Sequence, residues 1–437
     1  MINKSEVEKA LESSWHRQTA EASLERWIQL CEQQKWGQIP ENLSQLIAVF
    51  GVSWYFTRFI FYRGKEAAEF FDIPALESFD EEILIDFLSV VLQEDDQEIQ
   101  FEYLRRLKNQ TMLQILIRRL SLKDSLEDSE AALSRLAAAT LTVAMRIVGI
   151  ELEHPDCQVA VLGMGRIAGL EMNFGSDLDL IFLYKSSTEE FYTSFSEKVR
   201  KLLRNMSILT PTGVLYDVDM RLRPHGTSGA LITSAQSFLE YHQSKRESWE
   251  RQVMTRCCPI IDKQGLGRES LSQLTSFIYS DEKHEKLNTE ILNVRQRVED
   301  EIGNRRGKID VKRGRGGIMD IDFTTHYLQL KNGHKNPELQ TTSTREALRT
   351  LSKFNLLEPD DACAMRESYD YYKKVEACLR LFDLKSVSNF SRPVDNENPL
   401  VRAMSEGEGF GLADFINKYE AFNNTTRRIY LKMLAIS

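Results

Sequence analysis

Two aspartates interrupt a stretch of sequence that is otherwise suited to a buried strand. Residues 173–184 read N-F-G-S-D-L-D-L-I-F-L-Y, so Asp177 and Asp179 follow Gly175-Ser176 and stand two residues apart. Residues i and i+2 of a strand point to the same face of a sheet. Because burying unpaired carboxylates is costly, the pair indicates either a turn before the strand or a cation site at the edge of a sheet.

A second acidic stretch favours the cation site. The sequence L-Y-D-V-D-M-R-L-R-P places Asp217, Asp219, Arg221 and Arg223 on one face if the chain is extended there. A solvated charged face on an ordinary strand is the alternative. Two acidic same-face pairs in one region make that alternative weaker, and a third carboxylate from a neighbouring strand would complete a cage for two Mg²⁺ ions.

A glycine-rich stretch precedes the first acidic pair. Residues 163–169 read G-M-G-R-I-A-G and loosely match the fingerprint of a dinucleotide-binding fold. That fold needs a full crossover helix before its acidic residue. Asp177 follows Gly165 by only 12 residues, with Gly175-Ser176 between them. We therefore do not expect a dinucleotide site.

Three regions position these motifs. The first 148 residues hold only three glycines and two prolines, and their apolar residues recur at helical spacing, which predicts a helical domain over 1–149. Short apolar runs at 159–162, 180–183, 214–220 and 230–233, with a helix over 191–208, predict a small mixed-sheet α/β domain over 150–265. Helical periodicity returns over 266–437, interrupted by a glycine-rich break at 312–317.

The composition excludes several classes of protein. The chain has 437 residues, 42% of them hydrophobic, and a net charge of -9, which argues against bulk nucleic acid as the main partner. No apolar run approaches the length of a membrane span, and the first residues lack the layout of a signal peptide. Six scattered cysteines indicate reduced thiols in the cytoplasm, and the seven histidines lack zinc-ligand spacing.

The motifs together resemble a known family. G-S-D-x-D followed about 40 residues later by an acidic strand is similar to the nucleotidyltransferase superfamily. Four segments in order, G-M-G-R-I-A-G-L-E-M-N-F-G-S-D-L-D, L-Y-D-V-D-M-R-L-R-P, W-E-R-Q-V-M-T-R and D-V-K-R-G-R-G-G-I-M-D-I-D-F, resemble the glutamine-synthetase adenylyltransferase/adenylyl-removing enzyme family. The resemblance implies an α+β fold, with a nucleotidyltransferase mixed-sheet core flanked by helical N-terminal and C-terminal domains.

The resemblance also implies roles for single residues. Asp177, Asp179 and Asp219 match the family's catalytic, metal-binding acids, whereas Asp217 falls where the family varies. The positions matched to nucleotide or phosphate binding are Gly175, Ser176, Arg221, Arg223 and Lys312. For the two arginines, a structural salt bridge is an equal alternative. The remaining motif positions are Gly163, Gly165, Gly169, Gly316, Gly317, Asp320 and Asp322; the two acids are expected at a helix start or in the site.

The implied activity is Mg²⁺-dependent transfer of AMP from ATP to a tyrosine of glutamine synthetase, with a nitrogen-signalling protein as a further partner. Removal of the AMP by phosphate, which releases ADP, and a non-catalytic binding module are the alternatives. An RNA-directed nucleotidyltransferase is disfavoured by the acidic balance. We expect neither nucleic acid nor membrane as a partner.

The chain departs from the family pattern in three ways. Family members typically hold two copies of the unit, and this sequence contains one G-S-D-x-D. Arg166-Ile167-Ala168-Gly169 replaces the usual K-L-G-G, and Asp322 replaces the usual Glu. Segments such as T-S-G-A-L-I-T-S-A-Q-S-F resemble the attaching half, whereas M-N-F and W-E-R resemble the removing half; on balance we favour attachment.

Overall fold

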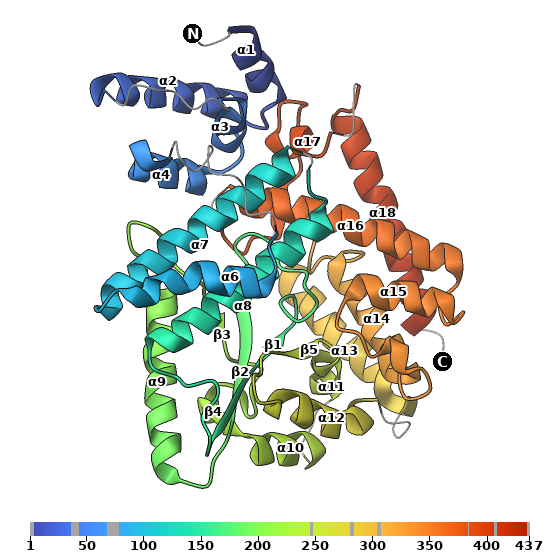
Figure 1. The fold of residues 1–437 in the computed structure, drawn as a ribbon. Coiled ribbons are helices and arrows are strands. Elements are labelled where there is room, and N and C mark those ends of the chain that lie inside the picture. Colours follow the sequence, from blue (N-terminus) through green and yellow to red (C-terminus); the bar gives the residue numbers. More distant parts are fainter. Residues whose placement is uncertain are drawn as a thin grey trace.

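The computed structural model describes residues 4–35, 43–67, 78–121, 123–244, 248–279, 284–303, 307–382, 384–405 and 409–434. Helices form the two ends of the described chain, and a five-stranded mixed sheet lies between them (Figure 1). This is the α+β architecture that the sequence predicts, with helices flanking a mixed-sheet core.

The N-terminal part consists of helices. They are α1 (Lys4–Ser13), α2 (Arg17–Gln33), α3 (Leu43–Phe50), α4 (Trp54–Arg63), α6 (Glu81–Ser89), α7 (Gln97–Leu120) and α8 (Leu126–Ile147), with a 3₁₀ turn at Val90–Gln93. Four of these helices (α4, α6, α7 and α8) begin at a capping side chain. The Asp96 side chain accepts hydrogen bonds from the first turn of α7, and Ser125 and Asp128 form a reciprocal capping box at α8. These caps fix where both helices begin.

The sheet has the strand order β3-β2-β1-β5, with β4 also paired to β2. Its strands are β1 (Gln158–Met164), β2 (Leu178–Lys185), β3 (Val218–Asp219), β4 (Ile232–Ser234) and β5 (Cys257–Ile261). β1 runs antiparallel to β2 and β5, whereas β3 and β4 pair parallel to β2. The sequence did not predict β5, because its central Pro259 reads as a strand breaker; the structure places it at a sheet edge, where proline is tolerated.

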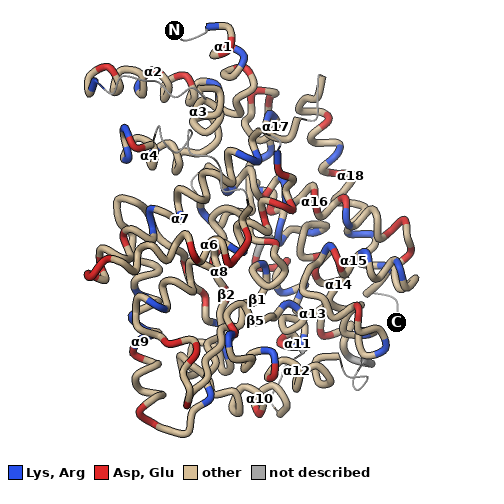
Figure 2. Tube along the Cα trace, in the orientation of Figure 1, with Lys and Arg blue, Asp and Glu red and all other residues tan. Residues whose placement is uncertain are grey.

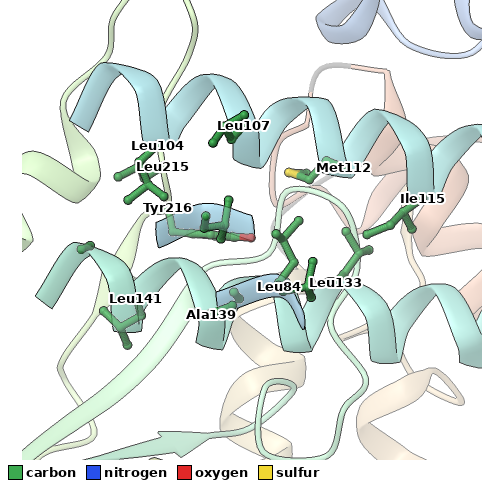
Figure 3. Close-up of a cluster of buried hydrophobic side chains, with 14 of the residues drawn as sticks. Leu84, Leu104, Leu107, Met112, Ile115, Leu133, Ala139, Leu141, Leu215 and Tyr216 are labelled. Carbon is green, nitrogen blue, oxygen red and sulfur yellow. The ribbon is translucent and has the colours of Figure 1, made fainter. Parts of the chain in front are cut away.

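The strand expected over 214–220 is much shorter in the structure. Only Val218 and Asp219 pair with β2, and the backbone N–H groups of Leu215 and Tyr216 donate instead to Met206 at the end of α9 (Glu189–Ser207). Both side chains pack among the helices, and Figure 3 shows Tyr216 between α7 and α8. The expectation that 217–223 form one extended charged face was therefore wrong beyond Asp219.

The two faces of the sheet belong to two different cores. Val159 and Val161 of β1 pack in one apolar cluster with the N-terminal helices, and Ala160 and Leu162 pack in a second cluster with the C-terminal helices. This follows from the period of two along a strand. The sheet is thus held between the two helical parts, so residues from both ends of the chain can reach its edge.

The C-terminal part supplies the remaining helices. They are α10 (Ala235–Ser244), α11 (Ser248–Met254), α12 (Leu266–Ile278), α13 (His284–Gly303), α14 (Ile318–Asn332), α15 (Thr344–Lys353), α16 (Pro359–Leu381), α17 (Pro399–Ala403) and α18 (Leu412–Leu434). A small antiparallel pair joins β6 (Lys308–Asp310) to β7 (Asn389–Ser391), with 3₁₀ turns at Gly226–Ser228 and Pro337–Leu339. Among the helices described, none combines the length and apolar character that crossing a bilayer requires.

Candidate active site

The Gly175-Ser176 turn leads directly into β2. The Ser176 N–H donates to the Asn173 carbonyl at 3.1 Å, and the Asn173 N–H donates to the Ser176 hydroxyl at 3.0 Å. Gly175 has φ of +62°, and a Cβ there would lie 2.5 Å from the Leu384 carbonyl oxygen. Only glycine therefore allows this left-handed turn to pack so closely against the segment that follows α16.

The parallel pairing of β2 and β3 brings two of the predicted acids together. Asp179 stands in register with Asp219, and on its other side Met164 of β1 faces it. A Cβ on Gly165, whose φ is +63°, would lie 3.3 Å from the Asp179 carboxylate. Asp177 is exposed one residue before the strand, and Asp217, exposed as well, lies one residue before β3.

The electrostatics of the site oppose ionisation of Asp179. Burial, followed by the charges of Asp177 and Asp219, raises the pKa of Asp179 to about 7, although Lys312 and Arg221 act in the other direction. Hydrogen bonds from Arg221 instead lower the pKa of Asp219. The site therefore concentrates negative charge around Asp179, as expected where a cation is to bind.

The donor chemistry fits Mg²⁺, although a complete cage is not preformed. Carboxylate oxygens are the ligands that Mg²⁺ prefers, and Asp179 carries a charge that a cation would stabilise. In the described part of the chain, however, no three acidic, histidine or cysteine side chains are already gathered as metal ligands. Arg221 Nε donates a hydrogen bond to Asp219 at 2.8 Å. Asp219 therefore has to release this hydrogen bond before its carboxylate can bind a metal.

Arg223, the second arginine of the R-L-R motif, stabilises the loop between β3 and β4 by hydrogen bonds to its backbone. Its guanidinium donates to the carbonyls of Met220 at 2.7 Å, Ala230 at 3.0 Å and Gly229 at 3.2 Å. Arg221 by contrast lies largely in solvent apart from its pair with Asp219. Arg223 is thus occupied by backbone carbonyls, whereas Arg221 is engaged with Asp219.

The glycine-rich segment after β6 brings Lys312 to the site. Asp310 accepts hydrogen bonds from the Lys312 and Arg313 N–H groups and so holds the turn. Lys312 is partly buried, and no described residue forms a hydrogen bond or ion pair with its ammonium group. Burial lowers its pKa, with Glu376 and Asp177 acting in the opposite direction. Lys312 is therefore a cation that lies beside the acidic cluster. Its ammonium group is still available to a ligand.

Two further glycines of this segment allow close packing. A Cβ on Gly316 would meet the Asn423 carbonyl at 2.2 Å, and one on Gly317 would meet the Val311 carbonyl at 2.5 Å. Gly163 lies in β1 against Ile260, and Gly169 lies against Arg256. These four positions, unlike Gly175, serve packing around the site and do not line it.

Comparison with known proteins finds two family models that match along the chain. A family model described as glutamate-ammonia ligase adenylyltransferase matches residues 43–273, just over half of the chain. The chain belongs to this family. A second family model, described as GlnD PII-uridylyltransferase, matches residues 282–434.

The relatives found in the adenylyltransferase family are longer proteins. The bifunctional glutamine synthetase adenylyltransferase/adenylyl-removing enzyme of Chromobacterium violaceum is 32% identical over 67% of this chain and 33% of its own length. The enzyme of the same description from Burkholderia mallei is 28% identical over 84% of this chain and 41% of its own length. The chain thus spans well under half the length of these relatives.

Arg166 and Asp322, two of the positions at which the sequence departs from the expected family pattern, are partners in the structure. Arg166 Nη2 donates to Asp322 Oδ2 at 2.9 Å. Asp322 also accepts from Thr344 at 3.1 Å. A longer cation with a shorter acid keeps such a pair in reach where the usual pattern has Lys and Glu. Asp322 is therefore engaged in a partly buried ion pair.

Asp320 is likewise occupied. It is fully buried, and its carboxylate accepts from Arg295 Nε at 2.7 Å, Arg427 Nη1 at 3.1 Å and the Gly316 N–H at 2.8 Å. These contacts fix the glycine-rich segment to α13 and α18. The structure thus places Asp320 at a helix start with a structural set of partners.

Sequence reasoning missed Glu171, which is the centre of a buried polar network. Its carboxylate accepts from Arg256 at 2.6 Å, the Tyr369 hydroxyl at 2.6 Å and the Thr344 N–H at 2.9 Å. Despite burial, the charges of Arg256 and Arg166 hold the pKa of Glu171 well below its usual range. A lone glutamate in the stretch G-L-E-M-N-F was the available signal.

The same reasoning missed the polar face of α16. Tyr369, Lys373, Glu376 and Arg380 recur at spacings of four, three and four, so they share one side of the helix. Figure 2 shows acidic and basic positions mixed along this helix. Arg380 Nη1 donates to the Ser176 hydroxyl at 3.0 Å, which links α16 to the turn of the candidate site.

Proposed function

We propose that this chain transfers AMP between ATP and a tyrosine of glutamine synthetase, with Mg²⁺ as the cofactor. The observation that carries the proposal is the register of Asp179 with Asp219 across β2 and β3, directly beside the Gly175-Ser176 turn. Membership of the adenylyltransferase family and the printed names of the relatives support the choice of protein substrate.

Each group has a role in this proposal. Asp177, Asp179 and Asp219 hold Mg²⁺, which would offset charge on the polyphosphate and make the attacking hydroxyl more acidic. The Ser176 hydroxyl donates to a phosphate oxygen. Lys312 supplies a compact positive charge on the same side of the site.

The transfer itself needs a proton acceptor, because a tyrosine hydroxyl has a pKa of roughly 10. A carboxylate oxygen of Asp219, released from Arg221, is our candidate. The tyrosine oxygen forms a bond to the α-phosphorus, and the bond from that phosphorus to the oxygen bridging to the β-phosphorus breaks. Pyrophosphate leaves, and the tyrosine proton passes to Asp219.

Removal of AMP by phosphate is the second candidate. An oxygen of inorganic phosphate forms a bond to the phosphorus of adenylyl-tyrosine, the bond from that phosphorus to the tyrosine oxygen breaks, and the tyrosine oxygen takes up the proton that the attacking phosphate loses, so that ADP is released. The attaching direction is favoured by the segments L-Y-D-V-D-M-R-L-R-P and T-S-G-A-L-I-T-S-A-Q-S-F, whereas M-N-F and W-E-R favour removal. A nitrogen-signalling protein would control either direction.

The direction is tested by the intact mass of glutamine synthetase. With Mg²⁺-ATP and this chain, the attaching reaction adds one AMP to each modified subunit. Pre-adenylylated glutamine synthetase with phosphate instead loses that mass and yields ADP if the chain is the removing unit. No mass change in either direction would contradict the proposal and leave a non-catalytic binding module as the better explanation.

A further inference from the structure

The Ser176 hydroxyl has an unusual set of partners. It accepts one hydrogen bond from the Asn173 N–H and one from Arg380 Nη1, both at 3.0 Å. Backbone N–H groups and guanidinium groups can only donate. Both acceptor positions of the hydroxyl oxygen are therefore used, and its own proton donates to none of the described residues.

Arg380 is held firmly in this position. It is 4% exposed, and its Nη2 donates to Glu376 at 2.8 Å, one turn earlier in α16. Glu376 in turn lies 3.6 Å from Lys373, which pairs with Glu130 of α8 at 2.9 Å. Arg380 Nε is buried and has no hydrogen-bond partner among the described residues. This row of charges fixes the guanidinium from behind while it faces the turn.

We propose that Arg380 is a positioning residue that makes the Ser176 hydroxyl a dedicated donor to the phosphate chain of the nucleotide. The inference rests on the function proposed above and adds to it that a helix of the C-terminal part sets the phosphate affinity of a turn in the sheet. By occupying a lone pair of the hydroxyl oxygen, Arg380 directs the hydroxyl proton away from the protein. It also polarises the O–H bond, since a hydrogen bond from a charged donor strengthens the next one in a chain.

A double-mutant cycle tests this role through binding of Mg²⁺-ATP, measured by calorimetry on the full chain. Arg380→Met should weaken binding about tenfold in the wild-type background, the size of one charge-assisted hydrogen bond. In a Ser176→Ala background the same change should weaken binding less than about twofold. Arg366→Met, on the same helix and outside this network, is the matched control and should leave binding unchanged.

A second variant distinguishes loss of the hydrogen bond to Ser176 from misfolding of the protein. Arg380→Lys keeps a cation beside Glu376, but its shorter side chain lacks the fork of two nitrogens with which Arg380 reaches Ser176 and Glu376 at once. It should fold like the wild type by circular dichroism and still lose most of the affinity that Arg380→Met loses. Wild-type affinity in this variant would contradict the inference.

The outcomes separate the two proposals. Equal losses for Arg380→Met with and without the Ser176 hydroxyl would mean direct contact with the nucleotide or a general effect on the fold, and would overturn the positioning role alone. A wild-type chain that binds neither Mg²⁺-ATP nor Mg²⁺-ADP would overturn the proposed function together with this inference.

Discussion

Asp179 is the residue of the site on which the neighbouring charges act most strongly. It lies between Asp177 and Asp219, where burial and both neighbouring carboxylates disfavour its charged form. Such a residue weakens the fold unless a cation is bound beside it. The carboxylate of Asp179 is therefore explained by the binding of a cation at the site and not by a contribution to the stability of the fold.

We expect Asp179→Asn to separate stability from function. Without Mg²⁺, removal of the repulsion should raise Tm by about 2–4 °C, as for a gain of about 1 kcal/mol in a large domain. Mg²⁺ should then raise Tm of the wild type and leave Tm of the variant unchanged. Differential scanning calorimetry with and without Mg²⁺ measures both effects, and equal stabilisation of the two proteins by Mg²⁺ would place the metal elsewhere.

At the scale of elements, the glycine-rich segment depends on a buried charge. Asp320 lies between Arg295 of α13 and Arg427 of α18 and also holds the Gly316 N–H. Asp320→Asn leaves both arginines without this partner, so we expect a loss of about 3–5 kcal/mol in the free energy of unfolding. Urea denaturation measures the loss, and the exposed Asp395→Asn serves as control with a change below about 0.5 kcal/mol.

Nucleotide binding by Asp320→Asn tests whether the role of Asp320 is structural. If it is, the folded fraction of Asp320→Asn should bind Mg²⁺-ATP at low temperature within about twofold of the wild type, since no ligand-facing group has changed. A stable variant with abolished binding would instead assign Asp320 to the site.

Helix α7 carries a lysine at its contact with the segment that leads into β3. Lys108 Nζ donates to the Val214 carbonyl at 3.1 Å, and burial, followed by the charge of Arg105, lowers the pKa of Lys108 to about 7. The unfolded chain, with an ordinary lysine pKa of 10.5, binds more protons than the folded chain between pH 7 and 10.5. The cost of burying Lys108 therefore grows as pH falls through this window and levels off below it.

Because the cost of burying Lys108 grows as pH falls, the effect of Lys108→Met on stability should depend on pH. The difference in Tm between variant and wild type should favour the variant most near pH 7 and shrink towards pH 10. Thermal denaturation at a series of pH values measures it. Lys65→Met, at an exposed position, should show a difference that does not vary with pH, and a flat profile for Lys108→Met would contradict the explanation.

On the scale of the whole molecule, buried ion pairs join the two helical parts to each other directly. Glu130 of α8 is 1% exposed and lies 2.8 Å from Arg345 of α15 and 2.9 Å from Lys373 of α16. Glu130→Gln should lower the free energy of unfolding by about 3–5 kcal/mol, because it removes the buried charge that Arg345 and Lys373 share and leaves each with only its second acid, Asp370 or Glu376. Glu127→Gln, on the same helix with an exposed pair to Arg349, should change it by less than about 1 kcal/mol. Similar urea profiles for the two variants would mean that the network does not join the parts.

The sequence predicts the parts of the site whose chemistry lies in local spacing. Gly175, Ser176, Asp177 and Asp179 are adjacent in the chain, so a turn with a same-face acidic pair can be recognised before any fold is known. Asp219 was selected from the acidic alternation in L-Y-D-V-D-M-R and from the family resemblance, and the structure pairs it in register with Asp179.

The rest depends on contacts between distant segments. Glu171 meets Tyr369 and Arg256 only because the C-terminal helices fold back onto the sheet, and no periodicity along the chain encodes that. The bonds of Arg380 to Ser176 and of Arg221 to Asp219 are likewise set by the arrangement of helix and loop. Fold class follows from patterns along the chain, whereas the partners of buried charges follow from the packing of whole elements.

The measurement that tests the central claim most directly compares two neighbouring acids in one assay. Intact mass of glutamine synthetase would be followed with Mg²⁺-ATP, or with phosphate after adenylylation, in the presence of Asp219→Asn or Asp217→Asn. We predict that Asp219→Asn slows the mass change at least about 100-fold, whereas Asp217→Asn, two residues earlier and exposed, keeps the rate within about threefold of the wild type. Equal rates for the two variants would contradict a reaction centred on Asp177, Asp179 and Asp219.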